Sequence, residues 1–261
     1  MIHWNVSPEI FELGPLRVRW YGLMFLTGFS LGYQGMKKIC QWEGLPVEKL
    51  DSLLVHLVLG TTIGARLGHC LFYDPVYYLS NPLEILKIWE GGLASHGGGV
   101  GVIIATWMFM RKNPEFHLWW LLDRLAIFTV MTGGFIRIGN LMNSEILGKP
   151  TDGTWGVIFE RVNQVPRHPA QVYESLCYFV IFAISYWVYL KFKEKTPQGL
   201  IFGFVLAAIF TCRFFIEFVK EIQSPFEQDM IINMGQMLSI PFVAFGLFFM
   251  LRALRVIKQR A

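Results

Sequence analysis

The chain has 261 residues, of which 54% are hydrophobic and 16% are charged, and its formal net charge is +4. An ordinary soluble domain carries roughly a quarter charged residues, so this composition is typical of a membrane protein. The Lys and Arg residues form no basic stripe of the kind that binds nucleic acid. The four cysteines stand singly, without a Cys-x-x-Cys pair, which argues against a zinc site or a disulfide framework.

Seven apolar segments are long enough to form transmembrane helices, each of which needs about 20 mostly apolar residues. They cover residues 18–36, 51–73, 96–110, 118–139, 171–190, 199–219 and 235–254. Several contain glycines four residues apart, such as Gly60 and Gly64, which permit close helix packing. The first ten residues lack the features of a cleaved signal peptide. We therefore predict an all-α, polytopic membrane protein with seven transmembrane helices, in which residues 1–261 form one integral membrane domain.

The distribution of basic residues predicts the orientation. If the N-terminus is outside, 12 of the 23 Lys and Arg residues fall in the inner segments and 7 in the longer outer segments. The positive-inside rule then places the N-terminus outside and the C-terminus inside. The longest outer connection, residues 140–170, has turn signals at Pro150 and Gly153. We expect it to form a small extracytoplasmic cap.

With this orientation, distant parts of the sequence deliver polar side chains to the outer half of the membrane. These residues are Tyr21, Arg66, His69, His96, Arg137, Asn140, Arg213 and Glu217. Ionisable residues in membrane spans are costly and usually mark functional sites. The convergence predicts a site open to the outer membrane face. Residues 133–148 would form one wall of it, and residues 140–145 would lead from the membrane to the cap.

Structural explanations remain open for the same residues. Arg137 could extend to the interface as an anchor. Arg213 and Glu217, four residues apart, could simply neutralise each other on one helix. His96 could cap a helix, with the glycines after it serving only in packing, and Tyr21 fits an interfacial aromatic belt.

Four polar residues, two of them from the set above, are interpreted as mainly structural. They are Arg66, His69, and the neighbours Asp123 and Arg124, which look like a local ion pair near the inner end of a span. A transporter for an anionic or lipidic solute is the alternative to an enzyme. It would need a polar path through the whole bilayer, yet the inner halves of the spans contain little that is polar besides Asp123 and Arg124.

A serine-hydrolase interpretation fails. Gly28-Phe29-Ser30-Leu31-Gly32 fits the pattern GxSxG, and a His-Gly-Gly-Gly run follows at residue 96. In α/β-hydrolases the oxyanion loop precedes the serine, which stands on a strand-to-helix turn. Here the order is reversed, and the serine lies in a predicted apolar helix.

Six motifs, in order along nearly the whole chain, resemble those of the bacterial prolipoprotein diacylglyceryl transferase family. They are RVRWYGLM (17–24), GARLG (64–68), GGLASHGG (91–98), RIGNLMNSE (137–145), HPAQVYE (168–174) and RFFIEF (213–218). The fourth resembles the family signature R-x-G-N-F-x-N-x-E. It departs from the usual pattern at Ile136 and Ser144, where glycine is common, and at Leu141, where phenylalanine is usual.

The resemblance implies a transferase that moves a diacylglyceryl group from phosphatidylglycerol to the cysteine thiol of a lipoprotein precursor, releasing glycerol phosphate. The implied partners are phosphatidylglycerol, the precursor's signal peptide with its cysteine, and membrane lipid; no nucleic acid, metal or organic cofactor is implied. The implied location is the bacterial inner membrane, with the active site facing the outer leaflet.

The resemblance also implies the site residues. The catalytic group is His96, Arg137, Arg213, Glu217 and Tyr21, and the substrate-binding group is Arg137, Asn140, Arg213, Glu145, Gly148, Gly97 and Gly98. Arginines suit the leaving phosphate, because its negative charge grows during the reaction. A thiol with a pKa of about 8.5 needs a base, and an imidazole with a pKa of about 6.5 is suitable for that role. Glu217 would orient Arg213, and Glu145 would orient the signature loop.

Overall fold

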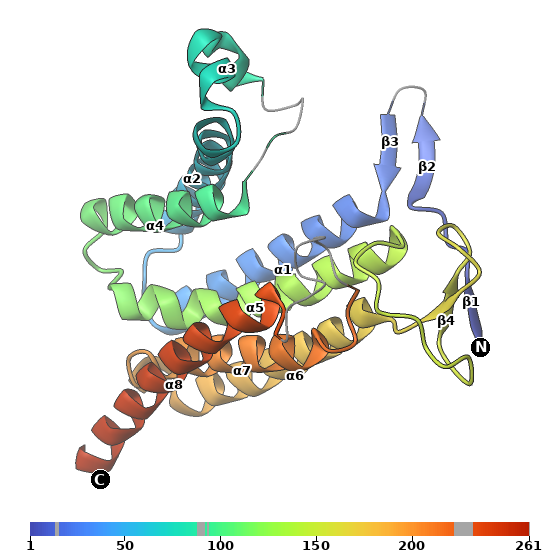
Figure 1. The fold of residues 1–261 in the computed structure, drawn as a ribbon. Coiled ribbons are helices and arrows are strands. Elements are labelled where there is room, and N and C mark those ends of the chain that lie inside the picture. Colours follow the sequence, from blue (N-terminus) through green and yellow to red (C-terminus); the bar gives the residue numbers. More distant parts are fainter. Residues whose placement is uncertain (14–15, 88–91, 93, 222–231, 261) are drawn as a thin grey trace. The chain divides into compact units, whose positions relative to one another are not determined.

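The computed structural model describes residues 1–13, 16–87, 92, 94–221 and 232–260, and most of them are helical (Figure 1). The chain divides into two compact units. The first unit comprises Met1–Met36 and Trp119–Ala261, and the second comprises Lys37–Leu118. Every residue of the candidate site except His96, Gly97 and Gly98 belongs to the first unit.

Seven helices of 17 residues or more occur in the described ranges, and each overlaps one predicted segment. They are α1 (Trp20–Trp42), α2 (Lys49–Phe72), α4 (Ser95–Lys112), α5 (Leu118–Met142), α6 (Ala170–Phe192), α7 (Leu200–Ile216) and α8 (Met234–Arg260). Shorter elements are α3 (Pro75–Ser80), η1 (Pro82–Leu86) and η3 (Lys193–Lys195). By length and hydropathy, α2, α5, α6 and α8 qualify as membrane spans, and α7 is apolar but shorter. Seven spans and the orientation of the termini stay predictions.

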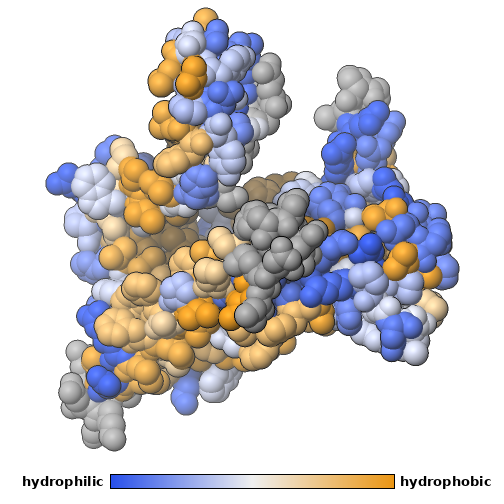
Figure 2. All heavy atoms as spheres, viewed as in Figure 1, coloured by the Kyte–Doolittle hydropathy of each residue, from blue (hydrophilic) through white to orange (hydrophobic). Residues whose placement is uncertain are grey.

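Hydrophobic side chains cover the outer surfaces of the long helices in the first unit. Figure 2 shows them over α6, α7 and α8, whereas the strand-containing region is mainly hydrophilic. Val180, Trp187, Phe245 and Phe248 are among the large apolar side chains that stay exposed. An apolar surface of this extent on a helical protein is typical of contact with lipid.

The chain is not wholly helical, so the all-α prediction is confirmed only as a mostly helical fold. Strands β1 (Ile2–Trp4), β4 (Val157–Phe159) and β5 (Pro166–Arg167) form one sheet, with β1 parallel to β4 and β4 antiparallel to β5. Strands β2 (Glu9–Leu13) and β3 (Leu16–Arg19) form a separate antiparallel pair. Alternation over two to five residues is too short to predict a strand from sequence.

Strand β4 contributes two side chains to a small apolar cluster. Leu147, Val157 and Phe159 are buried together, and Trp4 and Leu141 pack against them. The indole Nε1–H of Trp4 donates to the carbonyl oxygen of Leu141 at 3.1 Å. The amino-terminal strand is thereby attached to the last turn of α5. The one-domain assignment and the boundaries of the 140–170 cap stay predictions.

Glycines occur where long helices approach each other closely. A Cβ on Gly28 would lie 2.9 Å from the Thr132 side chain, and a Cβ on Gly203 would lie 2.7 Å from the carbonyl oxygen of Gly246. In the second unit, Gly64 faces the backbone of Gly97 in the same way. These contacts bear out the packing role inferred from the four-residue glycine spacing.

Asp123 and Arg124 do more than form a local pair. The Asp123 carboxylate accepts hydrogen bonds from the backbone N–H groups of Gly199 (2.9 Å) and Phe202 (2.8 Å), where α7 begins. Arg124 donates to the carbonyl oxygen of Lys193 at 3.1 Å. The two side chains therefore fasten α5 to the turn between α6 and α7, which the sequence interpretation missed.

Candidate active site

The signature motif is held together by its own side chains. Nη1 of Arg137 donates to Oδ1 of Asn140 at 3.1 Å, and Nδ2 of Asn140 donates to Oε1 of Glu145 at 2.7 Å. The backbone leaves the helix through two residues in the left-handed region, Ser144 (φ 55°) and Ile146 (φ 58°). This reversal turns Glu145 back towards α5, so that the motif forms a closed polar loop.

Two residues of a second helix, α6, hold this loop in place. Gln171, fully buried near the start of α6, donates through Nε2 to the carbonyl oxygen of Glu145. One turn further along α6, Oε2 of the buried Glu174 lies 2.7 Å from Nε of Arg137. The contact is an ion pair in which Nε–H is not aligned for a hydrogen bond. Arg137 is therefore fixed from two sides, by Asn140 and by Glu174.

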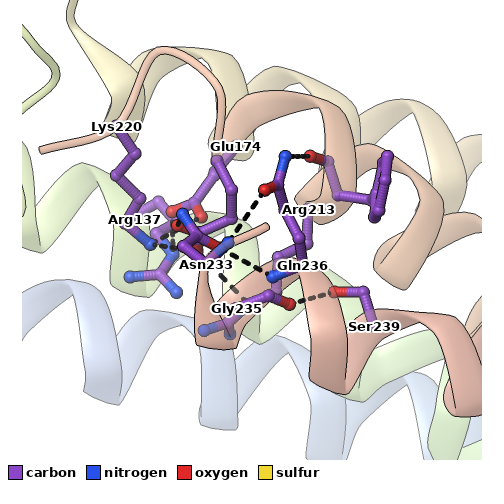
Figure 3. A network of polar contacts seen from close by, with 10 residues as sticks. Arg137, Glu174, Arg213, Lys220, Asn233, Gly235, Gln236 and Ser239 are labelled. Atoms are coloured by element: carbon purple, nitrogen blue, oxygen red, sulfur yellow. Dashed lines mark hydrogen bonds and ion pairs between the residues drawn. The ribbon is translucent and has the colours of Figure 1, made fainter. Parts of the chain in front are cut away.

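A row of alternating charges continues from Glu174 (Figure 3). Nζ of Lys220 lies 3.4 Å from Oε1 of Glu174 and 3.3 Å from Oε1 of Glu217. Glu217 in turn lies 3.6 Å from Nε of Arg213. The neutralising pair expected for Arg213 and Glu217 exists, but it is one link in a longer row. That row joins Arg137 to Arg213 through two carboxylates and one ammonium group.

The start of α8 supports Glu217. Asn233 and Gln236 form reciprocal bonds, from the N–H of Gln236 to Oδ1 of Asn233 (2.8 Å) and from the N–H of Asn233 to Oε1 of Gln236 (3.2 Å). Nδ2 of Asn233 also donates to Oε2 of Glu217 at 3.2 Å. A Cβ on Gly235 would lie 2.6 Å from the Glu217 carboxylate, so only glycine lets the acid approach the helix end this closely. A helix N-terminus favours a negative charge, which stabilises the ionised carboxylate.

Two tyrosines lie beside α5, the helix that carries Arg137. The ring of Tyr21, in the first turn of α1, contacts Gly139, where a Cβ would be 2.9 Å from Cδ2 of the ring. Tyr178 of α6 packs on Gly133 and interacts electrostatically with both Arg137 and Arg213. Tyr21 was predicted for the site, whereas Tyr178 was not.

Gly148 has a structural reason to be glycine. Its added Cβ would lie 2.5 Å from the carbonyl oxygen of His168 and 2.8 Å from that of Val219. It therefore sits between two backbone segments, and it forms an isolated β-bridge with Lys220. This bridge brings the segment that carries Lys220 alongside the end of the signature loop. A substrate-binding role for Gly148 stays a prediction.

The remaining predicted residues lie in the second unit. His96 is the second residue of α4, its side chain is exposed, and its ring stacks on Tyr73 and meets Phe72 edge-on. The N-cap position of α4 is occupied by Ala94 rather than His96, so the structure does not support the capping explanation. Gly97 packs against Gly64, which is a structural role. Whether these residues complete a site with the arginines stays a prediction. Residues 91 and 93 of the same motif lie outside the described residues.

Arg66 has the structural role that was expected of it. Its guanidinium donates to the carbonyl oxygens of Ile85 (2.9 Å), Glu84 (2.5 Å) and Gly92 (3.3 Å). It therefore fixes the connection that leads from α2 towards α4. His69 stacks on the Tyr73 ring.

Sequence reasoning missed Glu174, Lys220, Asn233, Gln236 and Tyr178. One signal was available for two of them, because an Asn followed three residues later by Gln before an apolar run is a capping-box pattern. Glu174 had no local signal, since its partners Arg137 and Lys220 are 37 and 46 residues away, and Lys220 had only its spacing of three residues from Glu217. Within the described ranges, no three His, Cys, Asp or Glu side chains gather in a way that could hold a metal ion.

Comparison with known proteins decides the family. The family profile described as prolipoprotein diacylglyceryl transferase matches residues 8–252. The chain belongs to the prolipoprotein diacylglyceryl transferase family. This confirms the resemblance inferred from the six motifs.

Three relatives, each named phosphatidylglycerol–prolipoprotein diacylglyceryl transferase, illustrate the similarity. The protein of Tolumonas auensis is 53% identical, covering 96% of this chain and 97% of its own length. That of Chloroherpeton thalassium is 44% identical, with 97% and 95% covered, and that of Bacteroides fragilis is 44% identical, with 95% and 94% covered. The chain is thus similar to members of the transferase family over almost its whole length.

Proposed function

We propose that this chain transfers the diacylglyceryl group of phosphatidylglycerol to the cysteine thiol of a lipoprotein precursor, in the inner membrane of a bacterium. The observation that carries the proposal is the row of ion pairs that holds Arg137 and Arg213 together. Membership of the transferase family supplies the reaction. The first step of lipoprotein maturation is therefore the activity to test.

The reaction is a displacement at carbon. The thiolate sulfur forms a bond to the glycerol carbon, the bond between that carbon and the phosphate oxygen breaks, and the thiol proton goes to a base. The phosphate enters as a monoanionic diester and leaves as glycerol phosphate with one more negative charge. Interactions that strengthen as this charge develops lower the barrier. No acyl-enzyme forms, because no ester carbonyl is attacked.

The two arginines suit different parts of this task. Arg213 is the more accessible, with 36% of its side chain exposed against 17% for Arg137, and its 3.6 Å contact with Glu217 is loose. We assign the departing phosphate first to Arg213, whose guanidinium can bind two phosphate oxygens. Arg137, fixed by Asn140 and Glu174, adds a rigid positive charge.

The thiol requires a proton acceptor, and the proposal gives this role to His96. A neutral imidazole can take a proton from a thiol, which is the role of a general base. Tyr21 donates to a substrate oxygen in the same proposal. The site opens to the outer leaflet, so that lipid and signal peptide enter sideways from the bilayer.

Purified protein in lipid nanodiscs, given phosphatidylglycerol and a signal peptide with its cysteine, should release glycerol phosphate and yield a thioether-linked peptide. A peptide with serine in place of cysteine is the control. The enzyme proposal fails if no glycerol phosphate appears. The variant Arg213→Ala should lose most of the activity, and near-normal transfer by His96→Gln would remove the histidine as the base. Protein-dependent flux of an anionic solute into sealed vesicles, without product, would favour the transporter instead.

A further inference from the structure

We propose that Lys220 is a positioning residue that keeps the two arginines of this site available to a phosphate. Its ammonium group touches both carboxylates of the charge row and touches neither arginine. This inference rests on the proposed function, because it assigns a supporting role within the same site. Lys220 lies outside all six sequence motifs.

Lys220 carries its positive charge in a buried position, where the charge needs partners of opposite sign. Only 5% of the side chain is exposed, and Glu174 beside it is 1% exposed. A buried ammonium group is unfavourable unless carboxylates compensate for its charge. Here one ammonium group is shared between Glu174 on α6 and Glu217 directly after α7. The arrangement gives two acids a common partner that is not an arginine.

The charges of the row show what this partner does. Three cations and two carboxylates leave a net charge of +1 when all five groups are ionised. Without Lys220 the two glutamates would be matched only by Arg137 and Arg213, and the net charge would be zero. Each arginine would then be drawn more closely to its own glutamate. A phosphate would have to compete with that carboxylate for the same guanidinium donors.

The backbone holds Lys220 in this position. Its residue is bridged to Gly148, the N–H of Lys149 donates to the carbonyl oxygen of Val219 at 2.7 Å, and the N–H of Glu221 donates to that of Leu147 at 3.1 Å. The segment is thus paired with the chain that leaves the signature loop. Lys220 therefore connects the signature loop, α6 and the end of α7 at one point.

The test compares four proteins in nanodiscs: wild type, Lys220→Met, Lys220→Arg and the double variant Glu174→Gln/Lys220→Met. The methionine removes the charge at similar size, the arginine keeps it, and the double variant returns the row to a net charge of +1. Lys191→Met is the matched control, because Lys191 is exposed at the other end of α6 and contacts only aromatic rings in the described structure. The measured quantities are the Kd for glycerol phosphate, and kcat and KM for phosphatidylglycerol, per folded molecule.

A unit charge about 8 Å from a phosphate, at an effective dielectric constant of about 20, changes an equilibrium by roughly thirtyfold. We therefore expect Lys220→Met to weaken glycerol phosphate binding about tenfold or more. Its kcat should fall by a larger factor than its KM rises, since the phosphate gains charge in the transition state. Lys220→Arg should stay within about threefold of wild type, and the double variant should recover at least part of the loss.

Three results would overturn the inference. One is that Lys220→Met binds glycerol phosphate within twofold of wild type. Another is that the double variant is no better than Lys220→Met, as expected if the lysine only held the fold together. If Lys220→Met does not fold, the double variant must bind glycerol phosphate less than about tenfold more weakly than wild type, and a larger loss is the third refuting result. The proposed function fails if the wild-type protein binds glycerol phosphate but does not form it from phosphatidylglycerol. In that case the Kd values for glycerol phosphate still decide the role of Lys220.

Discussion

Replacing Ser144 with glycine should stabilise the protein. Ser144 follows the end of α5 with φ at 55°, in the left-handed region that glycine adopts without steric cost. Its side chain is buried, and its hydroxyl makes no hydrogen bond within the described part of the chain. The position is also one where this sequence departs from the glycine that is common in the family signature. Ser144→Gly would relieve both the backbone strain and the unpaired hydroxyl.

The expected gain in the free energy of unfolding follows from three contributions, two that favour glycine and one that opposes it. A non-glycine residue in the left-handed region costs roughly 1–2 kcal/mol. A buried unpaired polar group costs roughly 1–3 kcal/mol. Glycine loses about 0.5–1 kcal/mol by making the unfolded chain more flexible. The net change should be a stabilisation of at least about 1 kcal/mol, which raises Tm by about 2–4 °C in a protein of this size.

The assay is thermal unfolding in one detergent, with the variant Ser185→Gly as the matched control. Ser185 is also buried, but it lies inside α6 and its hydroxyl donates to the carbonyl oxygen of Phe182 at 2.9 Å. Glycine in a helix interior is destabilising by about 1 kcal/mol, so this control should lower Tm. The reasoning is refuted if Ser144→Gly leaves Tm unchanged or lowers it while Ser185→Gly behaves as expected. Transfer activity should be retained, because the Glu145 contacts do not involve Ser144.

Four further substitutions test the packing within the two units by the same unfolding measurement. Gly101→Ala should destabilise by about 1–3 kcal/mol, because its Cβ would overlap the carbonyl oxygen of Gly60 where α2 and α4 cross. Gly99→Ala, which has nothing within 4 Å, should be neutral or gain up to about 1 kcal/mol; equal effects at the two sites would contradict the crossing. Gly148→Ala should lower Tm and also reduce transfer, since it displaces the segment next to it; an unchanged Tm would mean that this segment moves freely. Arg66→Lys should cost about 1–3 kcal/mol, because a compact ammonium group cannot reach the three carbonyl oxygens that the guanidinium contacts through three different nitrogens. A loss below about 0.5 kcal/mol would argue against that role.

The site was predictable only in part. Arg137, Arg213 and Glu217 stand out in the sequence, because charged residues in apolar segments are rare and costly. Glu174 looked like the end of a motif and Lys220 like a residue of an outer connection. Their importance comes from partners brought together by the fold, because Lys220 meets an acid on α6 and another at the end of α7. Charge patterns along a helix predict contacts three or four residues apart, but not contacts between helices.

The fold, like the site, was predictable from the sequence only in part. Hydrophobic segment length by itself determined where the long helices lie, because a buried or lipid-facing helix needs an uninterrupted apolar run of fixed length. The glycine spacing also indicated helices whose surfaces permit close packing. Only the tertiary structure decided that Ile2–Trp4 pairs with Val157–Phe159, that Asp123 caps α7, and that five charges form one row. Each of these joins distant parts of the chain, and such contacts follow from packing the whole molecule rather than from any local pattern of residues.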